Sequence, residues 1–105
     1  MRWISKETET PQDTERVIGW HRLSGSMPMY GTEVRHNPFV SHFARIGKTG
    51  WTDRGDALPT EKDADHTGCV LAATRSGEIR AARWEFVRSD TEFAKWRQLP
   101  GKPEG

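Results

Sequence analysis

The stretch that decides the fold class is CVLAATRSGEIRAARWEFV, residues 69–87. Its first half is a short apolar run, which is typical of a β-strand between turn signals. Gly77 follows, and glycine supplies the positive φ that a tight hairpin loop requires. In the second half Ala82, Trp84 and Phe86 alternate with polar or small residues. This period of two predicts a second strand over 79–87 with one buried and one exposed face.

Four more segments have strand or short-helix patterns. Residues 16–22 form an apolar run that ends at a Ser-Gly-Ser turn, and residues 39–46 form another that ends at Gly47. A short segment at Trp51 follows, and we expect it to pair with 39–46. Residues 93–97 are compatible with a single helical turn capped by Ser89-Asp90 or with an edge strand. No segment keeps a 3.6-residue apolar period over three turns, so long helices are not expected.

These patterns predict a mainly β fold, or a small α+β fold. We expect one domain over residues 1–100, built on a compact antiparallel sheet with at most one or two short helices and long loops. We expect a flexible C-terminal tail over residues 101–105. No internal repeat is evident in the sequence. The predicted core residues are Val17 or Ile18, Trp20, Phe43, Val70, Ala72, Trp84, Phe86 and Trp96.

The composition is polar for a folded domain. Hydrophobic residues make up 33% of the 105 positions and charged residues 30%, but the net charge is only +1. Acidic and basic segments alternate along the chain, which does not favour a dedicated polyanion binder. Five tryptophans are spread over the whole length. Because each ring can bury about 150–250 Å², we expect them to supply much of a small core.

The sequence predicts a cytoplasmic protein without a membrane association. The one cysteine, Cys69, cannot form an internal disulfide. The N-terminal residues lack the apolar segment of a signal peptide. No apolar run approaches the roughly 20 residues that cross a bilayer.

Short tryptophan-containing motifs lie at both ends of the chain: Trp3-Ile4-Ser5 with Pro11, and Lys95-Trp96-Arg97-Gln98-Leu99-Pro100. Together with the strand at 17–20 they resemble the phage and prophage "domain of unknown function 551" family. The resemblance covers the two outer thirds of the chain, and residues 24–68 have no counterpart in it. It implies a compact β-rich domain encoded by mobile elements. It carries no catalytic residues that could be transferred to this chain.

No pattern of catalytic or cofactor-binding residues is present, so we expect a non-enzyme without a cofactor. The acidic loop at 53–66 contains Asp63 and Asp65 beside His66, but it lacks the spacing of a calcium loop. We therefore predict no metal site and interpret this loop as solvated surface, although its binding of a cation stays open. Cys69 opens an apolar strand without a histidine at a spacing that would activate it.

Protein binding is the predicted function. Residues 24–38 have the composition of a long loop, and apolar side chains in such a loop are typical of interfaces. The alternative, that this loop folds back over the sheet, stays open. The predicted partner-binding residues are Met27, Met29, Tyr30, Arg80, Arg83 and Arg97.

We expect a small accessory factor from a phage or mobile element that binds a host or phage protein. Steric inhibition of a host defence protein is one concrete form of this function. The alternative is a nucleic-acid-binding β domain that uses the arginines and aromatic residues of its C-terminal strands. The oligomeric state does not follow from the sequence.

Overall fold

The structure, a computed structural model, describes residues 2–103. They fall into two compact units. The first unit comprises residues 2–47 together with 100–103, and the second unit comprises Lys48–Leu99. The stretch predicted as one domain, residues 1–100, thus contains two compact units. Of the predicted flexible tail, Gly101, Lys102 and Pro103 belong to the first unit, and residues 104–105 lie outside the described residues.

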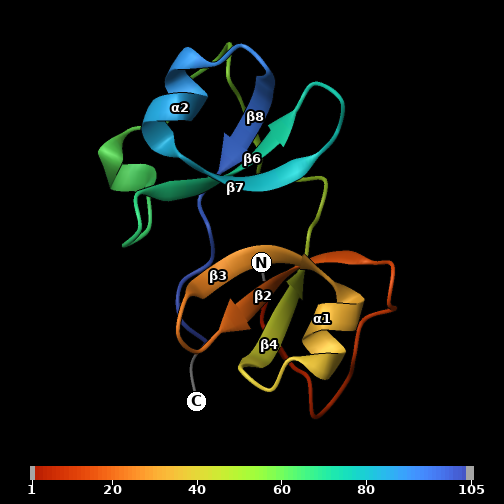
Figure 1. The fold of residues 1–105 in the computed structure, drawn as a ribbon. Coiled ribbons are helices and arrows are strands. Elements are labelled where there is room, and N and C mark those ends of the chain that lie inside the picture. The colour runs from red at the N-terminus through yellow and green to blue at the C-terminus, as the bar shows by residue number, and fades with distance from the viewer. Residues whose placement is uncertain (1, 104–105) are drawn as a thin grey trace. The chain divides into compact units, whose positions relative to one another are not determined.

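The first unit is a four-stranded antiparallel sheet with one short helix. Its elements are β1 (Ile4–Ser5), β2 (Arg16–His21), β3 (Gly25–Tyr30), α1 (Gly31–His36) and β4 (Val40–Arg45). The strand order is β1-β4-β2-β3, so β3 is an edge strand. Figure 1 shows α1 beside these strands, between the end of β3 and the start of β4.

The second unit has the same set of strands and one α-helix, with a short 3₁₀ helix added. Its elements are β5 (Thr52–Asp53), the 3₁₀ helix η1 (Glu61–Asp63), β6 (Cys69–Thr74), β7 (Ile79–Arg83), α2 (Trp84–Ser89) and β8 (Phe93–Arg97). The strand order is β5-β8-β6-β7, and all pairs are antiparallel. Figure 1 labels β6, β7 and β8 of this sheet together with α2. The predicted fold class is confirmed, because the described residues form a mainly β, antiparallel structure with short helices. They form two sheets rather than one.

The two units are an internal repeat, which the sequence did not reveal. Each runs strand, strand, strand, helix, strand, and each has the same strand order. The pairing registers also agree. Phe43 lies opposite Gly19 and Ile4 in the first unit, and Trp96 lies opposite Ala72 and Thr52 in the second. Residues of the two units can therefore be matched position by position.

The matched positions with the same residue are few and widely spaced. Val17 and Val34 correspond to Val70 and Val87, and all four are fully buried. Pro11 and Pro59, which lie in the connections before β2 and β6, are also fully buried. Because the shared residues are few and widely spaced, and because the connections differ in length, the repeat leaves only a faint trace in the sequence.

Each sheet packs its helix against its own apolar core. In the first unit the core consists of Val17, Met29, Val34, Val40 and Phe43. In the second unit it consists of Val70, Ala72, Val87, Phe93 and Trp96. The core prediction is confirmed for five positions, namely Val17, Phe43, Val70, Ala72 and Trp96. Ile18 is also buried, while Trp20 and Trp84 are half-buried.

The prediction that Phe86 lies in the core is wrong, because the second strand of the hairpin ends at Arg83. Residues 84–89 form α2 instead of continuing β7. In a strand Trp84 and Phe86 would share a face, but on a helix two residues that are two positions apart point in different directions. Val87 therefore fills the core at 0% exposure, and Phe86 is 59% exposed.

The prediction that residues 24–38 form a loop is also wrong. They contain β3 and α1, with Gly25 at a φ of 87° at the start of β3. Pro28 hides the strand in the sequence, because proline is rare within sheets except at an edge. β3 is such an edge, and it is antiparallel to β2 over its whole length.

Two strand-pairing predictions need correction, while the hairpin prediction is confirmed. Residues 93–97 form β8, which lies between β5 and β6 rather than at an edge. The segment after Trp51 forms β5, which pairs with β8 and not with 39–46. β6 and β7 pair as expected, and Gly77 between them has a φ of 93°.

A basic side chain closes the C-terminal end of the helix in each unit. Lys6 Nζ, just after β1, donates to the carbonyl oxygens of Val34 (3.2 Å) and Asn37 (2.9 Å). Arg54, just after β5, donates from Nε to Val87 O (2.8 Å) and from a terminal nitrogen to Arg88 O. The last carbonyl groups of a helix have no partner within the helix, so these bonds satisfy them and oppose the negative end of the helix dipole.

Replacing Arg54 with methionine should destabilise the protein by about 1–2 kcal/mol, because two charge-assisted hydrogen bonds to helix carbonyl groups are lost. Urea unfolding followed by circular dichroism measures the change. Lys62→Met is the control, because Lys62 is exposed in η1 and should change stability by less than about 0.5 kcal/mol. Equal stability of the two variants would show that the contacts of Arg54 do not support α2.

Candidate functional site

The six predicted partner-binding residues fall on different units. Met27, Met29 and Tyr30 lie on β3 of the first unit, and Arg80, Arg83 and Arg97 lie on β7 and β8 of the second unit. The two groups are therefore described separately below.

The β3 group contains one exposed side chain. Met29 is 2% exposed and packs in the core of the first unit. Its side chain occupies the space beside Gly19 on β2, where any added Cβ would overlap the Met29 sulfur. Met27 is half-buried against the same core, and Tyr30 is 54% exposed. The Arg16 guanidinium lies 4.7 Å from the centre of the Tyr30 ring. The sequence leaves two alternatives for this segment, an interface or a cover over the sheet. Met29 is buried against the sheet, as the second alternative predicts.

Arg97 is held on the surface of the second unit by contacts within that unit. One terminal nitrogen donates to Thr49 O at 2.8 Å, and its guanidinium carbon lies 5.8 Å from the centre of the Trp51 ring. Lys95 Nζ lies 5.1 Å from the same ring. These cation–π contacts explain the position of Trp51, whose role the sequence leaves open.

Arg80 and Arg83 line a groove between β7 and α2. This cavity has a volume of about 400 Å³, and we call it the β7–α2 groove. It is lined by Cys69, Arg80, Ala81, Ala82, Arg83, Phe86, Asp90 and Phe93. It combines two predicted residues with Phe86, which the sequence pattern places in the core. If residues 84–89 are interpreted as a helix, Val87 faces the core and Phe86 faces the surface. This pattern could have identified Phe86 as a surface residue.

The charges at the groove are largely compensated. An Arg80 terminal nitrogen lies 2.7 Å from Glu78 Oε2, and an Arg83 terminal nitrogen lies 3.3 Å from Glu85 Oε2. The hydrogen bond to Glu78 raises the pKa of Arg80 above its usual value. Because each arginine has an acidic neighbour, the groove lacks the strong positive potential that nucleic-acid binding requires. Its exposed apolar element is Phe86.

β7 is the edge strand of the second sheet, and alternate backbone groups on it point away from β6. Thr74 N donates to Glu78 O (2.9 Å), and Trp84 N donates to Gly68 O (3.0 Å). In an antiparallel ladder the residues that exchange such bonds alternate along the strand. The backbone N–H and C=O groups of Arg80 and Ala82 therefore also point to β6. The N–H and C=O groups of Ala81 and the N–H group of Arg83 then point to the open side of the strand, while the Arg83 carbonyl, at the N-cap of α2, accepts the first hydrogen bond of that helix. An edge of this kind can pair with another strand.

Two carboxylates of the acidic loop, Asp63 and Asp65, accept hydrogen bonds from nearby residues of the second unit. Asp65 Oδ1 accepts hydrogen bonds from Thr67 Oγ1 (2.6 Å), Thr67 N (2.9 Å) and Cys69 N (3.0 Å). Burial alone would raise the pKa of Asp65, but these hydrogen bonds outweigh it, so the pKa lies below the usual value. Asp63 is held by Thr60 N at 2.8 Å, which lowers its pKa. Residues 2–103 contain no group of three or more side chains that could together hold a metal ion.

Comparisons with known proteins do not place the chain in a family. No family model, no curated protein and no solved structure matches it. In the described part of the chain, none of the helices has the length and apolar character needed to cross a membrane.

Proposed function

We propose that this protein is a small non-enzymatic binding factor that takes up an extended segment of a partner protein along β7. The observation that carries the proposal is the open backbone edge at Ala81 beside the exposed ring of Phe86. Peptides that add a strand to a sheet gain affinity from main-chain hydrogen bonds and specificity from pockets for alternate side chains. The edge of β7 offers the main-chain groups, and the β7–α2 groove beside it offers a pocket for a side chain.

The internal repeat supports this choice, because the first unit has neither feature at the matched positions. Ala81 corresponds to Pro28. Pro28 lies opposite Ile18, which follows Val17, and Ala81 lies opposite Leu71, which follows the matched Val70. Proline has no N–H group to offer at an edge, and natural proteins use it there to prevent strand addition. Phe86, the third residue of α2, corresponds to Glu33, the third residue of α1. The second unit therefore differs from the first at the two positions that strand addition would use.

The biological setting is part of the proposal. The resemblance to the phage and prophage family leads us to propose a mobile-element protein that acts in the cytoplasm on a host or phage protein. Inhibition would then be steric, because a strand of the partner that is paired with β7 is unavailable to its usual neighbour. The arginines beside the groove have acidic partners, which favours a protein over a nucleic acid as the ligand of this site.

Peptides selected from a random displayed library against the full-length protein test the proposal. Ala81→Pro should weaken a selected peptide at least about tenfold, because it removes the outward N–H group. The sheet should stay intact, since residue 81 does not donate to β6 and proline is tolerated at an edge. Ala81→Val keeps the N–H group and should retain binding. Phe86→Ser should also weaken binding at least about tenfold.

Cys69 provides an independent readout of the same site. It is the one cysteine of the chain and it lines the groove, so a bound peptide should slow its alkylation by iodoacetamide. Pro28→Ala on β3 should leave both readouts unchanged. If selected peptides bind the Ala81→Pro and Phe86→Ser variants as tightly as the wild type, or if they leave the alkylation rate unaltered, the β7 site is rejected.

A further inference from the structure

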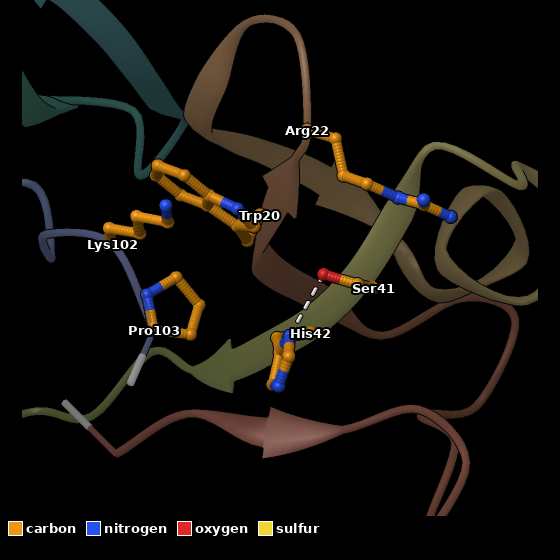
Figure 2. Close-up of a pocket in the computed structure, with 6 residues that line it drawn as sticks. All are labelled: Trp20, Arg22, Ser41, His42, Lys102 and Pro103. Atoms are coloured by element: carbon orange, nitrogen blue, oxygen red, sulfur yellow. Dashed lines mark hydrogen bonds between the residues drawn. The ribbon is translucent and has the colours of Figure 1, made fainter. Parts of the chain in front are cut away.

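A second cavity lies on the first unit and shares no residue with the site of the proposed function. Its volume is about 370 Å³, near the lower end of the roughly 300–1,000 Å³ that small-molecule sites occupy. Figure 2 shows its lining, which comes from three separate parts of the chain. We call it the Trp20 pocket. It is lined by Trp20, Arg22, Ser41, His42, Lys102 and Pro103.

The wall formed by the C-terminal residues is held in place by hydrogen bonds. Trp3 Nε1 donates to Gly101 O at 2.7 Å, and Ser26 Oγ donates to Pro100 O. Pro103 is buried. The Trp3 ring also meets the Trp20 ring edge to face, with ring centres 6.1 Å apart. Trp3 thus fixes both the position of Trp20 and the segment that carries Lys102.

The lining combines one large aromatic ring with hydrogen-bonding and cationic groups. Figure 2 shows Lys102 alongside the Trp20 ring and the Ser41 hydroxyl in the space between Trp20 and His42. Ser41 Oγ and His42 Nδ1 are 2.8 Å apart. Within residues 2–103, neither Lys102 nor Arg22 forms an ion pair.

Arg22 is partly committed to the fold. One of its terminal nitrogens donates to Pro38 O at 3.0 Å, and the corresponding Arg75 of the second unit donates from Nε to Thr91 O at 2.7 Å. A guanidinium group has five N–H donors, so Arg22 retains donors for a ligand. An adjoining hollow shares Arg22, Ser41 and His42 with the pocket and adds Lys6 and Glu7. The surroundings of the pocket therefore carry more positive than negative side chains.

The pocket favours binding over catalysis. A hydroxyl nucleophile requires a base that a third group orients. Within the described residues, the Ser41–His42 contact is the one hydrogen bond of the His42 ring. The described part of the first unit therefore presents no oriented triad at this place.

We infer that the Trp20 pocket binds a nucleotide, with the base against the Trp20 ring and the phosphate at Lys102, while Arg22 adds positive charge at the opposite rim (Figure 2). Stacking on an aromatic side chain beside a cation is how proteins hold nucleotides without reading their sequence. The pocket belongs to the first unit alone, because Trp20, Ser41 and His42 correspond to Ala73, Ala94 and Lys95 in the second. The nucleotide is either free or part of a single strand, and both present the same base and phosphate.

Calorimetric titration at low salt separates these sources. The probes are adenosine 5′-monophosphate, adenosine, and an oligodeoxyadenylate of about eight nucleotides, within the range of single-strand sites. Saturable binding of the mononucleotide identifies a free nucleotide as the ligand. Binding of the oligonucleotide alone, falling steeply with salt, identifies a single strand. Adenosine should bind about tenfold more weakly than its monophosphate, because it lacks the phosphate contacts.

Lys102→Gln should lower about tenfold the affinity for the probe that binds. Lys95→Gln is the matched control, because it removes the same charge beside another tryptophan in the second unit and should leave the affinity unchanged. Trp20→Leu should abolish binding, and amide spectra confirm that the variant is folded. Absence of binding by every probe, or equal losses in the two lysine variants, would overturn the inference. A failure here leaves the β7 proposal unaffected, since that proposal is read out by peptide binding and Cys69.

Discussion

Replacing Gly31 with alanine should destabilise the protein by about 3 kcal/mol or more, although alanine is the better helix former. A Cβ at Gly31 would overlap the backbone carbonyl oxygen of Gln12. That carbonyl cannot move away easily. Gly31 N donates to Glu15 O (2.8 Å), Thr32 N donates to Asp13 O (3.2 Å), and Glu15 N donates to Gln12 O (3.0 Å). Overpacking against fixed backbone costs about 1–3 kcal/mol or more, which exceeds the gain of about 1 kcal/mol from helix propensity.

The measurement is urea unfolding of Gly31→Ala beside Gly55→Ala. An added Cβ at Gly55 would meet nothing within 4 Å, so this control should change stability by less than about 0.5 kcal/mol. A Gly31→Ala variant that is as stable as the wild type, or more stable, would show that helix propensity outweighs the contact with Gln12. In that case the segment before β2 does not pack against the start of α1.

Replacing Phe43 with alanine should cost about 3–5 kcal/mol, the largest single loss in the first unit. Phe43 is fully buried on β4, between β1 and β2, and it packs with Val17, Met29 and Val34. Removing the ring leaves a cavity that the paired strands cannot close. Because a whole domain is stabilised by only about 5–15 kcal/mol, this loss should unfold a large fraction of the molecules on mild heating.

Two controls accompany the Phe43 variant. Phe43→Leu keeps most of the volume and should cost less than about 1.5 kcal/mol. Phe39→Ala removes a ring that is 48% exposed and stacks on His21, so it should cost less than about 1 kcal/mol. Thermal unfolding followed by circular dichroism gives the Tm of each of the three variants and ranks their stabilities. Equal losses for Phe39→Ala and Phe43→Ala would contradict the core assigned to the first unit.

The candidate site could be predicted from the sequence only in part. The sequence predicts two of its residues, Arg80 and Arg83, on the second strand of the hairpin, where Ala82 and Trp84 alternate with Ala81, Arg83 and Glu85. Phe86 escapes prediction, because the same alternation continues past Arg83 although the backbone turns into a helix there. The sequence places Met29 on a surface loop, since Pro28 and the nearby glycines have the composition of a turn. Its burial depends on β2, which lies opposite it in the sheet.

The sequence by itself determined the local features of this protein. The strands β2, β4 and β6, the β6–β7 hairpin with Gly77 at its turn, and the buried valines follow from alternation and turn chemistry within a few neighbouring residues. Only the tertiary structure decided which strands are edges, where the two units divide, and how residues 100–103 come to wall the Trp20 pocket. These features depend on contacts between residues that are far apart along the chain, and no local pattern records them.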